Sequence, residues 1–182
     1  MLVDIATVYY RAYFAMPDSM RSPDGTQINA VRGSLDALAL LIEKYRPQRL
    51  AVCWDLAWRP EWRVAEIDTY KTARVAGPGE EQMPDTLSNQ VDLLRAILDE
   101  LGVENVGLAN YEADDLVAHY SRTEPGPIWV VSGDRDLMQL VDDQREVRMI
   151  YLATGISRHT LADNEYIRTR SVSYTHLRAH ET

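Results

Sequence analysis

Carboxylate side chains recur in this chain directly after short apolar runs. The runs LVD at 2–4, LAVCWD at 50–55 and IWVVSGD at 128–134 each end in an aspartate, and a further acidic cluster lies between the last two. Together these positions supply seven carboxylates: Asp4, Asp55, Glu112, Asp114, Asp115, Asp134 and Asp136. If the runs are neighbouring parallel strands, their carboxyl ends share the sheet edge where α/β folds build ligand sites.

Seven carboxylates at one edge would repel one another strongly. Hard cations with oxygen ligands, Mg²⁺ or Mn²⁺, neutralise such a cluster, so the pattern predicts a metal-dependent phosphoryl-transfer site. Each acid also has a simpler interpretation, as a helix cap, a turn residue or a counter-charge to a helix dipole. Three acids within 112–115 exceed what a helix dipole needs, which favours metal binding.

A basic segment, RPEWRVAEIDTYKTAR at 59–74, follows the second apolar run. If it is helical, Lys71 and Arg74 present two cations to one phosphate, and Tyr70 is placed to stack on a base. An exposed amphipathic segment without such a role explains the same pattern. The residues alone leave both interpretations open.

The formal net charge of −9 taken alone argues against a nucleic-acid partner. Bound divalent ions would cancel part of that charge. Basic residues are also concentrated at 44–74, and a locally basic strip can hold phosphates on an acidic protein. A solvated surface of mixed sign fits the composition equally well.

At 182 residues the chain fits one domain. No apolar run approaches the roughly 20 residues needed to cross a bilayer, and the N-terminus lacks the basic region of a signal peptide. The single Cys53 excludes an internal disulfide and lies in an apolar run typical of a reduced core thiol. We therefore expect a cytoplasmic monomer with no membrane partner.

Alternating strand and helix patterns indicate a mostly parallel sheet. Strands are expected at 1–4, 49–54, 103–108, 128–132 and 147–152. Helices are expected at 5–16, 30–45, 112–122 and about 137–141, with another that Asp85 caps and Gly102 ends. The stretch 56–83 has no regular period and is expected to be a long connection of the kind that carries function.

In order and spacing, these motifs resemble the 5′–3′ exonuclease and flap endonuclease family. The resemblance is to small stand-alone bacterial members and to the N-terminal nuclease domain of bacterial DNA polymerase I. The matching stretches cover about residues 1–165: LVDIATVYYRAYF, PDGTQINAVRGSLDAL, RLAVCWDLAWRPEWRVAEIDTYKTAR, NYEADDLVAHY and VVSGDRDLMQLV. The resemblance implies a PIN-like three-layer α/β domain, with a central mostly parallel sheet and helices on both faces.

The same resemblance implies a role for each site residue. The seven carboxylates, Asp134 among them as a catalytic residue, would hold two Mg²⁺ or Mn²⁺ ions directly or through water. Residues of an arch at about 56–83 would contact DNA: Arg63, Tyr70, Lys71 and Arg74. Lys71 and Arg74 would assist at the scissile phosphate, while the metals stabilise charge on the attacking and leaving oxygens. The implied substrate is DNA with a 5′ end or 5′ flap, cleaved in replication and repair.

The chain departs from the family pattern in two places. Ile5, Ala6 and Thr7 follow the first aspartate, where the family usually has Gly. A Gly-Asp-x-x-Asp element with two further metal-site aspartates, and the helix-hairpin-helix-like region that grips duplex DNA, are absent after Tyr151. We therefore expect a C-terminally shortened member with an incomplete second metal site. Residues 171–182 lack apolar periodicity and are expected to be a non-native tail.

Two alternatives stay open. The chain is an inactive nuclease fragment that binds metal or single-stranded DNA, or it is a PIN-like ribonuclease. The ribonuclease class needs fewer acids and lacks the Tyr-Lys-x-x-Arg signature. Ala6 occupies the position where a haloacid-dehalogenase-type phosphatase requires a second aspartate, and the sequence has no Gly-rich phosphate loop with Lys.

Overall fold

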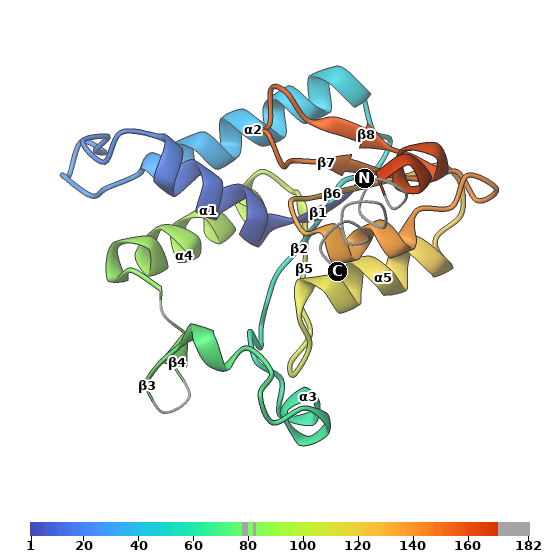
Figure 1. Ribbon diagram of the computed structural model, residues 1–182. Helices are drawn as coiled ribbons and strands as arrows, with labels where there is room; N and C mark the ends of the chain where they lie inside the picture. The colour runs from blue at the N-terminus through green and yellow to red at the C-terminus, as the bar shows by residue number, and fades with distance from the viewer. Residues whose placement is uncertain (78–79, 82, 171–182) are drawn as a thin grey trace, which may run out of the picture.

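A six-stranded sheet forms the centre of the computed structural model, which describes residues 1–77, 80–81 and 83–170 (Figure 1). The strand order is β5-β2-β1-β6-β7-β8. β1 pairs in parallel with β2 on one side and β6 on the other, and β8 pairs antiparallel with β7. The strands are β1 (Leu2–Asp4), β2 (Ala51–Cys53), β5 (Glu104–Val106), β6 (Ile128–Ser132), β7 (Val147–Tyr151) and β8 (Thr160–Ala162). The expected mostly parallel sheet is confirmed.

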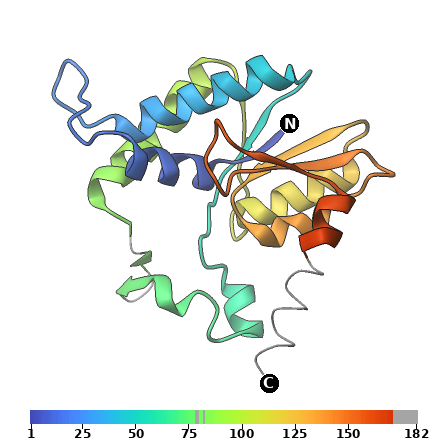
Figure 2. The ribbon, with the colours of Figure 1, turned by 45° about the horizontal axis from the view of Figure 1, so that its top comes forward.

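Helices cover both faces of this sheet (Figures 1 and 2). One face carries α1 (Ile5–Ala15), α2 (Asn29–Tyr45) and α4 (Asp85–Glu100), and the other carries α5 (Ala113–Thr123) and the 3₁₀ helix η2 (Arg135–Leu140). Two hydrophobic cores result, because successive residues of a strand point to opposite faces. In the central strand, Val3 packs in the first core and Leu2 in the second.

Cys53 is fully buried in the second core, and its burial raises the pKa of the thiol to about 12. The expected core thiol is therefore confirmed.

None of the helices in the described ranges has the length and apolar character required to cross a membrane.

The described part of the connection at 56–83 extends away from the sheet and the helices that cover it (Figures 1 and 2). It contains a short helix, a 3₁₀ turn and a two-stranded antiparallel hairpin: α3 (Glu61–Glu66), η1 (Thr72–Arg74), β3 (Val75–Gly77) and β4 (Glu80–Glu81).

Sequence analysis did not predict α3 or β8. The expected cap of α4 was wrong, because Pro84 is the N-cap and Asp85 the first helical residue. The predicted non-native tail, 171–182, lies outside the described residues.

The buried side-chain amide of Gln90 takes part in the contacts that link α1, α2 and α4, the three helices on one face of the sheet. The N-cap of α2 supplies no side-chain hydrogen bond of its own. Instead Gln90 Oε1, from α4, accepts hydrogen bonds from the N–H groups of Ala30 at 2.8 Å and Val31 at 3.4 Å. Gln90 also donates to Asn29 Oδ1, and Asn29 Nδ2 donates to the carbonyl of Tyr13 near the end of α1. These two amides join the termini of α1 and α2 to α4.

Replacing Gln90 with Leu is expected to lower the free energy of unfolding by about 1–3 kcal/mol, because it keeps the volume but leaves buried N–H groups without an acceptor. Urea denaturation measures the change. Gln144→Leu, at an exposed turn position, is the control and should have almost no effect. Equal stability of the two variants would show that the amide network contributes nothing.

Candidate metal and phosphate site

A cavity of about 780 Å³ opens at the carboxyl ends of β1, β2 and β6. It is lined by all eleven residues that the sequence analysis singled out. They are Asp4, Asp55, Arg63, Tyr70, Lys71, Arg74, Glu112, Asp114, Asp115, Asp134 and Asp136. Residues far apart in the sequence therefore meet in one place, with the carboxylates from the sheet edge and the cations from the connection that follows β2.

The parallel sheet explains why the acids converge. Asp4 is the last residue of β1 and the N-cap of α1, while Asp55 and Asp134 each come two residues after a strand. Asp114 and Asp115 lie in the first turn of α5. Because β1 lies between β2 and β6, the ends of these strands form one edge.

Hydrogen bonds to backbone hold several of these acids. Asp55 Oδ1 accepts from the N–H of Ala113 at 2.7 Å, which joins the end of β2 to the start of α5. Asp134 Oδ1 accepts from the N–H of Asp136 at 2.9 Å, so the capping role considered for Asp134 is confirmed. Asp115 Oδ2 accepts from the N–H of Glu112 at 3.1 Å.

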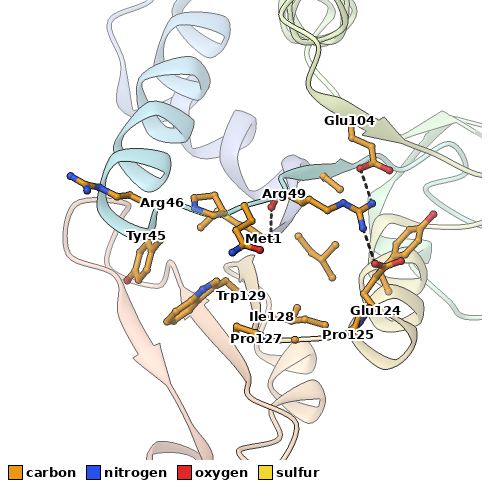
Figure 3. A pocket seen from close by; sticks show the side chains of 16 residues that line it. Met1, Tyr45, Arg46, Arg49, Glu104, Glu124, Pro125, Pro127, Ile128 and Trp129 are labelled. Carbon is orange, nitrogen blue, oxygen red and sulfur yellow. Dashed lines mark hydrogen bonds and ion pairs between the residues drawn. The ribbon is translucent and has the colours of Figure 1, made fainter.

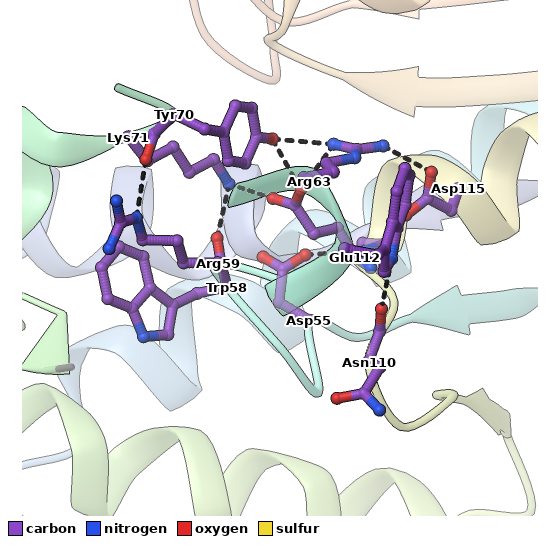
Figure 4. Close-up of polar contacts among 11 residues, drawn as sticks. Asp55, Trp58, Arg59, Arg63, Tyr70, Lys71, Asn110, Glu112 and Asp115 are labelled. Carbon is purple, nitrogen blue, oxygen red and sulfur yellow. Dashed lines mark hydrogen bonds and ion pairs between the residues drawn. The ribbon is translucent and has the colours of Figure 1, made fainter. Parts of the chain in front are cut away.

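Two basic residues of the connection, Arg63 and Lys71, are paired with the acids (Figure 4). Glu112, which is only 2% exposed, contacts Lys71 Nζ through Oε1 and Arg63 Nη1 through Oε2 at 2.5 Å. The Tyr70 hydroxyl donates to the same Oε2 at 2.6 Å, and Arg63 Nη2 reaches Asp115 Oδ1 at 2.5 Å. A buried carboxylate is costly unless it is paired, so these cations make the buried position of Glu112 possible.

Burial and like charge perturb the remaining acids. Burial raises the pKa of Asp114 to about 7, with the charges of Asp4 and Asp134 adding to the effect. Desolvation by the walls of the cavity raises the pKa of Asp55 to about 6, and the charge of Asp4 adds to the effect, although part of the residue is exposed to solvent. Additional positive charge at this edge would favour the ionised form of both carboxylates.

The donor set suits a hard divalent cation, since carboxylate oxygens are the ligands that Mg²⁺, Mn²⁺ and Ca²⁺ prefer. Within 1–77, 80–81 and 83–170, however, no three Asp, Glu, His or Cys side chains are placed closely enough to hold an ion as they stand. Lys71 and Arg63 instead pair with Glu112. Cation binding by Glu112 therefore requires these two side chains to give up some of their contacts.

Three polar residues at the cavity were missed by the sequence analysis. Arg122 lines it from α5, seven positions after Asp115, so helical periodicity was an available signal. Thr7 lines the cavity, and Ser132 is fully buried beside it. Both hydroxyls donate to Asp4. The Thr7 contact is local, because Thr7 is the third residue of the helix that Asp4 caps, so the Asp-x-x-Thr spacing was an available signal. The Ser132 contact depends on the pairing of β1 with β6, which no local pattern reveals.

A second cavity, of about 400 Å³, lies at the amino ends of the strands (Figure 3). Arg49 makes three polar contacts in this cavity. Its guanidinium pairs with Glu124 through Nη1 at 2.9 Å and with Glu104 through Nη2 at 3.5 Å, and the Arg49 carbonyl accepts a hydrogen bond from the Met1 ammonium at 2.8 Å. This edge contains none of the predicted site residues. The candidate site is therefore the cavity at the carboxyl edge.

Solved structures with the same architecture include those of a phage nuclease. The 5′-exonuclease of bacteriophage T5 with bound zinc has a TM-score of 0.63 and 17% identity, covering 90% of this chain and 57% of that one. A complex of the T5 flap endonuclease with DNA and metal ions has a TM-score of 0.59 and 16% identity. At this level of identity the likeness establishes the fold, and it confirms the expected PIN-like α/β domain.

The chain belongs to the 5′-3′ exonuclease family, because its residues 1–172 match the N-terminal resolvase-like domain of that family. It is 49% identical over 175 residues to a 5′-3′ exonuclease of Streptomyces coelicolor, covering 93% of this chain and 58% of that protein. A 5′-3′ exonuclease of Mycobacterium tuberculosis is 45% identical over 169 residues, covering 88% and 53%. The chain thus spans little more than half the length of these relatives.

The raised pKa values predict how stability depends on pH without metal. Between about pH 4 and 7 the folded chain holds more protons on Asp55 and Asp114 than the unfolded chain, so these residues make stability fall as the pH rises. In chelator, Asp114→Asn should therefore flatten the pH dependence of the unfolding midpoint. Asp92→Asn, at an exposed position on α4, is the control. An identical slope in wild type and Asp114→Asn would contradict the assignment.

Proposed function

We propose that this chain is the metal-dependent nuclease domain of a 5′–3′ exonuclease or 5′-flap endonuclease that cleaves DNA. The observation that carries the proposal is the cavity at the carboxyl edge, which combines seven carboxylates suited to divalent cations with basic side chains suited to phosphate. Family membership supports the class of reaction.

The seven carboxylates would hold the divalent ions, which we propose to be Mg²⁺ or Mn²⁺. When bound, such ions place positive charge next to the attacking and leaving oxygens of a phosphodiester. Asp4, Asp55 and Asp134 come from three adjacent strands and are the fixed part of the set. Glu112 becomes available when Lys71 and Arg63 exchange its carboxylate for another anion.

The anion proposed for that exchange is a DNA phosphate. Lys71 and Arg74 are placed to stabilise the scissile group, while Arg63 and Tyr70 guide the strand toward it. The Tyr70 ring already has the Arg63 guanidinium at 5.4 Å and the Lys71 ammonium at 5.5 Å from its centroid. This arrangement keeps an aromatic face beside two cations, as single-stranded nucleic acid requires.

The proposed partner is DNA with a 5′ end or 5′ flap, bound by a monomer in the cytoplasm. Support for DNA as the partner comes from the T5 flap endonuclease, which was solved with DNA and metal ions. Matching segments also occur in longer replication enzymes: DNA polymerase I of Lactococcus lactis is 29% identical over 157 residues, covering 82% of this chain and 17% of that protein. This match supports a role in replication and repair.

Cleavage of a labelled 5′-flap DNA with Mn²⁺, with chelator, and beside a matched RNA tests the proposal. Asp134→Asn should lower the rate about a hundredfold or more, since removing one ligand costs several kcal/mol of transition-state stabilisation. Asp142→Asn is a matched control, because Asp142 also accepts a hydrogen bond two residues onward, from Gln144 at 2.9 Å, but does not line the cavity. Wild-type rates for Asp134→Asn would remove the metal assignment. Mn²⁺ binding without cleavage would support a binding fragment, and preference for RNA a ribonuclease.

Lys71→Met should separate binding from chemistry. Loss of the ammonium frees Oε1 of Glu112 and removes a like charge from the cation site, so Mn²⁺ is expected to bind on the order of fivefold more tightly. Cleavage is expected to fall, because the phosphate loses its partner. Lys44→Met, on the last turn of α2, should change neither quantity. A parallel loss of Mn²⁺ affinity and of cleavage would contradict the proposed competition for Glu112.

A further inference from the structure

Two hydroxyl groups lie against Asp4 at the end of the central strand. Thr7 Oγ1 donates to Asp4 Oδ2 at 2.6 Å, and Ser132 Oγ donates to the same oxygen at 2.7 Å. Among the described residues, the other oxygen, Oδ1, receives a single long contact of 3.5 Å, from the N–H of Thr7. Asp4 is 5% exposed and Ser132 is fully buried, so water competes little for these bonds.

The same two hydroxyls also accept hydrogen bonds from the loop that follows β6. Thr7 Oγ1 accepts from the N–H of Gly133 at 3.3 Å, and Ser132 Oγ accepts from the N–H of Asp134 at 3.0 Å. A hydroxyl has one hydrogen to donate and two lone pairs to accept with, so each can serve both contacts at once. Each hydroxyl therefore links the carboxylate of β1 to the backbone that carries Asp134.

Close approach of the loop requires a glycine at position 133. A Cβ atom there would lie 2.9 Å from Thr7 Cγ2 and 2.9 Å from the Arg11 guanidinium. Any side chain would push the loop away from α1 and lengthen the contact with Thr7. The loop that carries Asp134 is thus seated directly against the first turn of α1.

From these contacts we infer that Thr7 and Ser132 form a hydroxyl clamp that positions Asp4 for a divalent cation and fixes its distance from Asp134. The clamp fills Oδ2 with two charge-assisted hydrogen bonds, which are stronger than neutral ones, and leaves Oδ1 as the oxygen for the cation. Both residues act through Asp4 and are positioning residues. The inference rests on the proposed function, because it assigns the clamp to that metal site.

The clamp is tested by Mn²⁺ titration calorimetry on the 182-residue chain. Thr7→Val keeps the shape and removes the hydroxyl, and Ser132→Ala removes the second donor. Loss of a group that orients a metal ligand typically weakens affinity 10–100-fold, and we expect Mn²⁺ binding to weaken by that factor in each variant. Thr7→Ser restores the hydroxyl and should restore affinity.

Ser121→Ala is the matched control, since Ser121 is also fully buried but donates to the carbonyl of Ala118 within α5. It should bind Mn²⁺ as the wild type does. Thr7 is only half-buried, so Thr7→Val decides the question even if Ser132→Ala fails to fold.

The outcomes separate the clamp from the function on which it rests. Weakened Mn²⁺ binding in Thr7→Val with recovery in Thr7→Ser supports the clamp. Unchanged affinity in Thr7→Val, even with a lower unfolding temperature, overturns the clamp and leaves the proposed function standing. Absence of Mn²⁺ binding by the folded wild type overturns both.

Discussion

Repulsion among carboxylates is the constraint around which this molecule is organised. Seven acids line one cavity with four basic side chains, Arg63, Lys71, Arg74 and Arg122, which leaves a formal excess of three negative charges. Desolvation raises the pKa values of Asp55 and Asp114, and the neighbouring carboxylates add to the effect. The strand ends and helix caps bring the carboxylates together. The connection after β2 supplies positive charge beside them, from Arg63, Lys71 and Arg74.

The basic residues of the connection therefore have two uses. In the structure, Arg63 and Lys71 act as internal counter-ions for Glu112. In the proposed reaction they face phosphate instead. The two uses are compatible because a carboxylate and a phosphate oxygen make similar charge-assisted hydrogen bonds, so one partner can replace the other. In the proposed exchange Asp4 and Asp134 keep their hydrogen bonds at the sheet edge, while Arg63 and Lys71 change partners.

Much of this arrangement was predictable from local patterns. Apolar runs ending in aspartate located β1, β2 and β6, and helical periodicity located α2, α4 and α5. Parallel pairing then required the acids to converge. Short or pairing-dependent elements were not predictable: α3 spans six residues, and β8 exists through its pairing with β7. The contact of Ser132 with Asp4 was missed for the same reason, since it depends on strand order, whereas the Thr7 contact is local to the start of α1.

The strand order has a consequence for how the chain folds. The central strand pairs Leu2 with Ala51 on one side and with Val130 on the other, so the cavity closes only after two distant segments have found residues at the very start of the chain. Closing such large loops is entropically costly and slows folding. We therefore expect the acids to meet late in folding, after most of the native surface is buried. A divalent cation bound there would accordingly slow unfolding and leave the folding rate nearly unchanged. In stopped-flow mixing experiments, the unfolding limb of the chevron plot would shift and the folding limb would not.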